Sequence, residues 1–141
     1  MFVRAEEQGR ESAMTPFAIA VLLTILATPK PAALIAIYTL AIADPLAAIV
    51  GIRFGRRHLA HNRSREGSGA FFAATVAIAA AVLRWSTAAA AWPITGSAAA
   101  IGGVAVANEL LPLRVDANLT IPIVVGFAAW AIPALFGITL T

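Results

Sequence analysis

Five apolar runs separated by short polar segments divide the chain, and each run predicts one helix. The runs span residues 17–28, 32–52, 69–83, 86–107 and 119–140. They do not show the strict two-residue alternation that is typical of a barrel strand. Amphipathic periodicity of 3.6 residues is weak, as expected for helices surrounded by lipid and by each other. The pattern predicts an all-α fold: a polytopic transmembrane bundle of about five helices, formed by residues 1–141 as a single domain.

The first run is the shortest, because only twelve residues precede the sequence Pro29-Lys30-Pro31. A helix needs about 20 residues to cross the hydrocarbon core of a bilayer. Extension over the mildly polar residues 12–16 makes a thin span, and the alternative is a half-helix or an interfacial segment. Residues 1–16 contain three Glu, which argues against a signal peptide. We expect them to form a cytoplasmic N-terminal segment.

The composition excludes an ordinary soluble domain. Hydrophobic residues make up 60% of the chain and charged residues 12%, whereas soluble domains carry about 25% charged residues. The mean hydropathy is +0.86. This composition also argues against a disordered tail or a coiled coil and predicts an integral membrane protein. Disulfides, thiolate nucleophiles and thiolate metal sites are excluded, because the chain has no Cys.

The basic residues favour an orientation in the bilayer rather than a nucleic-acid partner. With the N-terminus in the cytoplasm and five spans, eight Lys and Arg residues lie inside and two, Lys30 and Arg84, lie outside. This distribution satisfies the positive-inside rule. It predicts a multi-pass membrane protein with cytoplasmic loops at 53–68 and 108–118; if the source is a prokaryote, the membrane is the cell membrane. If the first run is only a half-helix, the N-terminus changes side and the later loops keep theirs.

Most polar chemistry is thus expected on one face. A channel or carrier would place polar groups along its whole path. A single charged face instead predicts activity at that face.

Asp44 is the one charge that falls deep inside an apolar run. It lies nine residues before Arg53, or about 13 Å along a helix. A carboxylate at that depth costs a few kcal/mol unless it is paired or hydrated. One interpretation is a structural ion pair with an Arg. The other is a cation or proton site, because Pro45 interrupts the helical hydrogen bonds and leaves carbonyl oxygens near the carboxylate.

A second group of polar residues lies between the fourth and fifth runs. Glu109 and Asp116 flank a short turn. Together with Asp44 they would form an all-oxygen site, which suits Mg²⁺ or Mn²⁺. The alternative is an ordinary solvated loop.

The loop between the second and third runs is strongly basic. Five Arg fall within residues 53–65, and they suit either anionic lipid head groups or phosphates. Residues 64–69 are small or polar and open the next helix, whose N-terminus would bind an anion. The loop contains no Walker pattern. His58 and His61 lack a clear third ligand for zinc.

Three segments of the chain, in order, resemble motifs of the dolichol kinase, phytol kinase and CTP-dependent diacylglycerol kinase family. Residues 44–55 resemble the family's G-D-x-x-A-x-x-x-G-x-x-[FY]-G, and residues 63–68 resemble its K-[ST]-x-E-G-[ST]. Residues 109–122 resemble its E-x-x-P…D-[DN]-N-[LF]-x-[IV]-P, and residues 9–16 are a fainter match to a G-E-[SL]-x-G…P stretch. The chain departs from these motifs at Ala43, Arg63 and Ala117, where the family has Gly, Lys and an acidic or amide residue. Family members also carry helices upstream, so the chain resembles an N-terminally short version.

The resemblance implies an enzyme that transfers the γ-phosphoryl group of CTP to a membrane lipid alcohol at the cytoplasmic face. The alcohol would be a polyprenol or dolichol, phytol or diacylglycerol, and the cofactor Mg²⁺ or Mn²⁺. The implied metal ligands are Asp44, Glu109 and Asp116, and the implied catalytic residues are Asp44, Glu66 and Asp116. The implied nucleotide-binding residues are Arg53, Arg63, Ser64, Gly67, Ser68 and Asn118.

Two other functions stay open. A phosphatidate cytidylyltransferase would use the same nucleotide and metal to make CDP-diacylglycerol. A non-catalytic membrane subunit or fragment would instead pack against another membrane protein. The expected partners are CTP, a lipid alcohol and the bilayer, with room for a second copy or for helices supplied by another chain.

Overall fold

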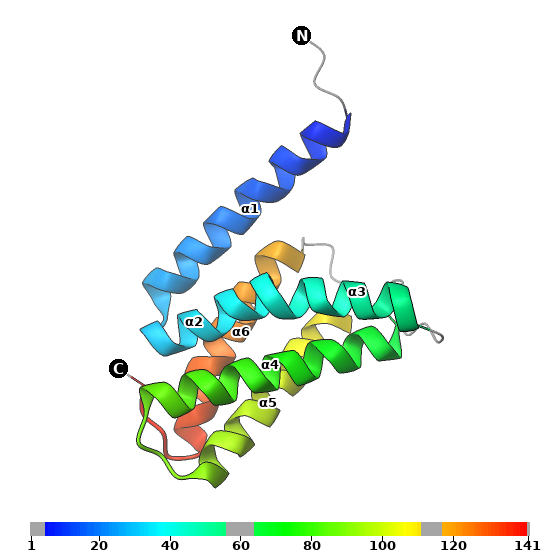
Figure 1. Ribbon diagram of the computed structural model, residues 1–141. Helices are drawn as coiled ribbons and strands as arrows, with labels where there is room; N and C mark the ends of the chain where they lie inside the picture. The colour runs from blue at the N-terminus through cyan, green and yellow to red at the C-terminus, as the bar shows by residue number, and fades with distance from the viewer. Residues whose placement is uncertain (1–4, 56–63, 111–116, 141) are drawn as a thin grey trace.

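The computed structural model describes residues 5–55, 64–110 and 117–140, and its regular structure there is helical. In chain order the elements are α1 (Ala5–Ala27), α2 (Lys30–Tyr38), the π-helical turn η1 (Thr39–Ala43), α3 (Asp44–Phe54), α4 (Arg65–Ser86), α5 (Ala91–Leu110) and α6 (Ala117–Leu135). The elements α2, η1 and α3 follow one another without a break and form one rod (Figure 1). The described part of the chain therefore contains five helical rods, which confirms the all-α prediction.

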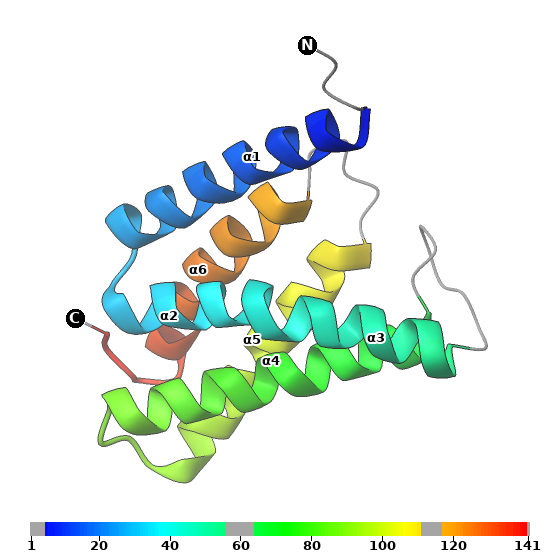
Figure 2. The ribbon, with the colours of Figure 1, turned by 45° about the horizontal axis from the view of Figure 1, so that its top comes forward.

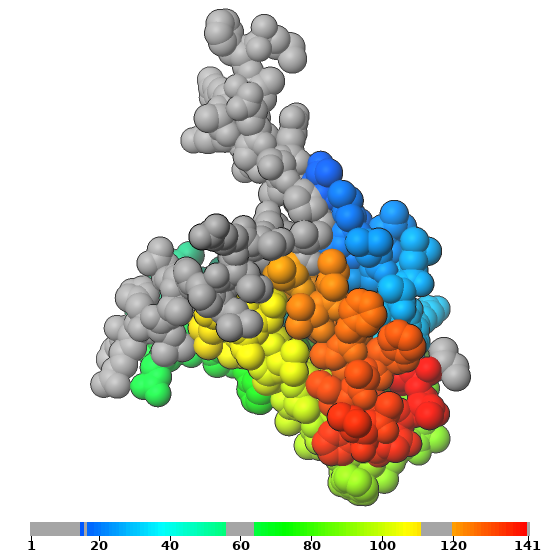
Figure 3. Space-filling view, turned by 180° about the vertical axis from the view of Figure 1, so that it is seen from behind, coloured from blue at the N-terminus to red at the C-terminus, as the bar shows by residue number. Residues whose placement is uncertain are grey.

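Successive rods run in roughly opposite directions (Figures 1 and 2). α4 packs against both α3 and α5, while α6 packs against α5, α2 and α1. Seen from behind, α6 lies between α5 and α1 on the surface (Figure 3). The rod formed by α2, η1 and α3 contacts two other helices at different points along its length: α2 contacts α6, and α3 contacts α4.

Alanine makes up 8 of the 17 residues in the buried core of the described chain. The other residues are larger, and Ile35, Phe71, Leu83, Ile101 and Val125 among them are fully buried. Alanine lets helix axes approach closely, and this is the usual way helices pack where no hydrophobic effect drives them together. The buried alanines of the core are Ala32, Ala36, Ala43, Ala47, Ala79, Ala98, Ala105 and Ala129.

Two helices in the described residues are long and apolar enough to cross a membrane, namely Lys30–Phe54 and Arg65–Ser86. Two shorter apolar helices span Phe17–Ala27 and Thr120–Leu135. The shortness expected of the first apolar run is therefore seen, although α1 itself begins at Ala5 and includes polar residues.

Several helix ends differ from the expected ones for local reasons. α4 begins at Arg65, within the segment 64–69 expected to open it and four residues before the apolar run itself, because the Ser64 hydroxyl caps the helix and accepts a 2.9 Å hydrogen bond from the Gly67 N–H. α5 begins at Ala91 instead of Ser86. α6 ends at Leu135 instead of Leu140, since Gly137 turns the chain.

The end of α6 illustrates the role of glycine. Gly137 has a φ of +82°, a backbone angle that residues with a Cβ rarely adopt. The Ile138 N–H then donates to the Pro133 carbonyl at 2.8 Å and the Gly137 N–H donates to the Ala134 carbonyl at 3.1 Å. This arrangement resembles a Schellman motif and returns the buried Ile138 side chain to the core.

Candidate functional site

The first two motif segments contact each other through glycine. A Cβ placed on Gly67 of α4 would lie 2.9 Å from the Ala47 carbonyl oxygen and 3.3 Å from the Gly51 Cα, both on α3. Such distances leave no room for a side chain, so the two backbones touch directly. Ala47, Gly51 and Gly55 follow one another at four-residue spacing and form the small-residue face of α3 that receives α4.

Ser64 joins the same contact. A Cβ on Gly51 would lie 3.1 Å from the Ser64 Oγ, and a Cβ on Gly55 would lie 2.8 Å from the Ser64 Cβ. Ser64 is buried and its hydroxyl caps α4 through the Gly67 N–H. The residues predicted to bind nucleotide, Ser64 and Gly67, are therefore held against the end of α3.

The third segment meets the bundle where α5 ends and α6 begins. Asn108 and Glu109 are 7% and 8% exposed, and both carboxylate oxygens of Glu109 are buried. The Asn108 Nδ2 donates a long 3.5 Å hydrogen bond to the Thr120 Oγ1, which links α5 to α6. Acidic side chains in a solvated loop are normally exposed. The burial of Glu109 therefore favours its interpretation as part of a site.

These ends lie on one side of the molecule. Figure 2 shows the start of α1, the end of α3, the start of α4, the end of α5 and the start of α6 on the same side. The connections from α1 to α2 and from α4 to α5 lie on the opposite side, as does the C-terminus. The segments that the sequence assigns to the cytoplasm thus share a side of the described structure.

Asp44 lies deeper than these ends. It is residue 15 of the 25-residue rod Lys30–Phe54, and its Oδ1 atom is buried. The π-helical turn η1 immediately precedes it, and the Asp44 N–H donates to the Thr39 carbonyl, five residues back. The turn carries the chain into Pro45, which has no N–H to donate. π-helical turns within α-helices are frequent at functional sites.

The remaining predicted residues divide into two groups. Arg53 is exposed at the end of α3, Glu66 is half-buried in the first turn of α4, and Ser68 is 6% exposed. The Ser68 Oγ has no hydrogen-bond partner among the described residues. Arg63 and Asp116 lie outside the described residues, and Asn118 is placed in the first turn of α6 by its backbone alone.

Of the three predicted metal ligands, the structure describes Asp44 and Glu109, while Asp116 lies outside the described residues. Within the described part of the chain, no group of three His, Asp or Glu side chains is close enough to hold a metal ion. Asp44 and Glu109 each bring buried carboxylate oxygens. Carboxylate oxygens are the kind of donor that a hard cation takes.

Sequence reasoning missed the direct contact between Gly51 and Gly67. The signal was present, because Ala47, Gly51 and Gly55 repeat a small residue every fourth position. Gly51 and Gly55 stand at the end of the second apolar run, where the sequence is as consistent with a loop as with close helix packing. In the structure Gly51 lies inside α3 and Gly55 ends it.

Comparisons with known proteins add no family. No protein-family model matches the chain, and no curated protein or solved structure is significantly similar to it.

Proposed function

We propose that the protein is a membrane-embedded kinase that transfers the γ-phosphoryl group of CTP to a lipid alcohol. The observation that carries the proposal is the glycine contact between α3 and α4. It joins the segment after Asp44 to the Ser64–Ser68 turn through backbone atoms. These are two of the three segments in which the sequence resembles lipid-alcohol kinases.

The surface supports an embedded position. Large apolar side chains are exposed on several rods, among them Leu26 at 74%, Ile52 at 86% and Leu135 at 83%. Exposed large apolar side chains on several rods suit a surface that contacts lipid. In the proposed topology the helices span the membrane, and the side with the start of α1, the end of α3, the start of α4, the end of α5 and the start of α6 faces the cytoplasm.

The start of α4 suits a phosphate group. Its first backbone N–H groups point out of the helix, the Ser64 cap fixes their direction, and Gly67 and Ser68 add little bulk. Arg53 and Arg65 are exposed on the adjoining helix ends. Guanidinium groups suit phosphate oxygens because they donate paired hydrogen bonds in a plane. We assign the triphosphate to this turn, together with Arg63 and Asn118.

The acidic residues supply the remaining chemistry. Asp44, Glu109 and Asp116 would hold Mg²⁺ or Mn²⁺, which neutralises phosphate charge as the transfer proceeds. The lipid hydroxyl oxygen forms a bond to the γ-phosphorus, the bond from that phosphorus to the β,γ-bridging oxygen breaks, and CDP leaves. The hydroxyl proton passes to the carboxylate of Glu66 or Asp116. The lipid chain would lie between the α2–η1–α3 rod and α6.

The test is a transfer assay with the purified protein in lipid nanodiscs. [γ-³²P]CTP is offered with a polyprenol, phytol or diacylglycerol, and label is expected in the lipid fraction. Asp44→Asn is expected to lower the rate by about 100-fold or more, because a charge next to the reacting phosphates is lost. Glu7→Gln, which removes a carboxylate from the N-terminal segment, is the control and is expected to retain activity.

The alternatives give different results in the same assay. With phosphatidic acid as the acceptor, a phosphatidate cytidylyltransferase would place label from [α-³²P]CTP in CDP-diacylglycerol, and label from the γ position would leave with pyrophosphate. Absence of lipid labelling from either nucleotide, or an unchanged rate in Asp44→Asn, would refute the kinase proposal.

A further inference from the structure

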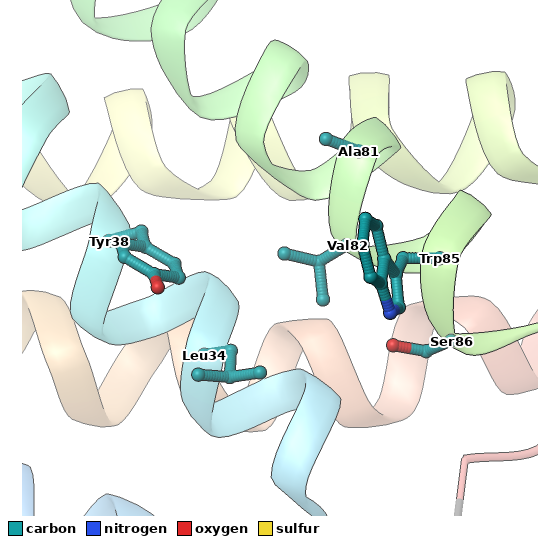
Figure 4. Close-up of a pocket in the computed structure, with 6 residues that line it drawn as sticks. All are labelled: Leu34, Tyr38, Ala81, Val82, Trp85 and Ser86. Carbon is teal, nitrogen blue, oxygen red and sulfur yellow. The ribbon is translucent and has the colours of Figure 1, made fainter.

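A pocket lies between α2 and α4, on the side of the bundle away from the candidate site. Its volume is about 310 Å³, and it is lined by Leu34, Tyr38, Ala81, Val82, Trp85 and Ser86. Figure 4 shows Leu34 and Tyr38 on α2 facing Val82 and Trp85 on α4 across it. Neither the nucleotide nor the acidic residues of the proposed reaction involve this pocket.

The pocket is lined mainly by carbon, with polar atoms contributed by Tyr38, Trp85 and Ser86. Leu34, Ala81 and Val82 present only carbon atoms to it. The Trp85 indole nitrogen and the Ser86 hydroxyl lie at the same end in Figure 4, where α4 finishes. Trp85 is 93% exposed, and Tyr38 is 44% exposed. Trp85 lies in the last turn of α4. Exposed Trp side chains at the ends of apolar helices are typical of the level where hydrocarbon meets lipid head groups.

One positive charge stands above this polar end. Lys30 lies four residues before Leu34, so it is on the same face of α2, one helical turn closer to the end of the rod. Its side chain is exposed. Arg84 is the other exposed cation near this end, and neither it nor Lys30 lines the pocket. A cation over an apolar groove complements a molecule with an anionic head and a hydrocarbon tail.

We propose that this pocket binds an anionic phospholipid from the leaflet opposite the candidate active face. An acyl chain fills the space between Leu34 and Val82, and the lipid phosphate interacts with the Lys30 ammonium group. Ser86 and Trp85 donate hydrogen bonds to the ester and phosphate region. The inference rests on the embedded position in the proposed function, and it does not depend on catalysis.

Tryptophan fluorescence tests the site directly. The chain has three Trp, so Trp92→Phe/Trp130→Phe leaves Trp85 as the only reporter. The protein is placed in nanodiscs that contain phosphatidylglycerol or phosphatidylcholine brominated on the acyl chain. We expect half-maximal quenching of Trp85 at about a fivefold lower fraction of brominated phosphatidylglycerol, the equivalent of roughly 1 kcal/mol for one cation near an anionic lipid.

Variants separate a site from general lipid contact. Lys30→Gln is expected to remove the fivefold preference, while Arg84→Gln, which removes the other exposed cation at this end, is expected to keep it. Ala81→Phe fills the pocket and is expected to remove the preference with Lys30 intact. A reporter with Trp92 alone, which lies near the same end but does not line the pocket, should be quenched equally by both lipids.

The outcomes also separate this site from the proposed function. Equal quenching of Trp85 by both lipids, or a preference that survives both Lys30→Gln and Ala81→Phe, would overturn the lipid site and leave the kinase proposal untouched. Quenching by neither lipid would overturn the embedded position itself. A selective Trp85 signal without CTP-dependent transfer would support the lipid site while refuting the kinase.

Discussion

The contact between α3 and α4 predicts that Gly67 and Gly69, two positions apart in α4, respond differently to the same substitution. A Cβ on Gly67 would lie 2.9 Å from the Ala47 carbonyl oxygen, whereas a Cβ on Gly69 meets nothing within 4 Å. Both residues lie in α4. Replacement of either by Ala gains about 1 kcal/mol of helix propensity, so only the contact distinguishes them.

The magnitude follows from the geometry. An ordinary carbon–oxygen contact is longer than 2.9 Å by about half an ångström, and the neighbour here is backbone, which cannot rotate away. Overpacking of this kind costs about 1–3 kcal/mol. Gly69→Ala is therefore expected to stabilise the protein by up to about 1 kcal/mol. Because of the overpacking, Gly67→Ala is expected to be less stable than Gly69→Ala by about 1–3 kcal/mol.

The assay is thermal or denaturant unfolding of both variants in the same nanodiscs, followed by circular dichroism, with CTP transfer measured in parallel. Gly67→Ala should also lower the transfer rate, because the α4 turn that is assigned to phosphate moves away from α3. If the two variants gain equal stability, the backbones of α3 and α4 do not touch at Gly67 and the reasoning is refuted.

Three further predictions concern the metal, the helix cap and the sidedness. EDTA should stop phosphoryl transfer and added Mg²⁺ or Mn²⁺ should restore it; activity that persists in EDTA contradicts the assigned carboxylate roles. Ser64→Ala should lower the free energy of unfolding by about 1 kcal/mol, because the Gly67 N–H loses its acceptor, and an unchanged unfolding curve would show that the cap is dispensable. The chain has no Cys, so Phe54→Cys and Ala88→Cys, both at exposed positions, are clean probes of the two sides. An impermeant maleimide on intact cells should label Ala88→Cys alone, and the reverse pattern would invert the proposed topology.

The number and order of the helices could be predicted from the apolar runs, because the runs are separated by charged residues or Pro. The ends were less predictable. Ala91 begins α5 because residues 87–90 leave the helix after the Thr87 hydroxyl closes α4 on the Leu83 carbonyl at 2.7 Å. Thr is common inside apolar helices, so Thr87 does not by itself predict that α4 ends there.

The candidate site was predictable as a set of residue types, but its geometry was not. Glu109 belongs to a polar loop in the sequence-based interpretation, yet the structure buries it at the end of α5. That burial depends on where α6 begins, and the Asn108–Thr120 hydrogen bond joins residues twelve apart. Such long-range placement has no local sequence signal. The role of Asp116 stays a prediction, since that residue lies outside the described part of the chain.

The π-helical turn between α2 and α3 has a consequence for how the rod meets its neighbours. In this turn the N–H of Asp44 donates to a carbonyl five residues back, so the turn contains one residue more than a turn of α-helix. The buried faces of α2 and α3 therefore point in different directions around the axis of the rod. The first half can then direct Ile35 and Ala36 into the core beside α6, while the second half directs Ala47 and Gly51 to α4. Deletion of a single residue from Thr39–Ala43 would align the buried faces of the two halves. The rod could then pack correctly against only one of α4 and α6.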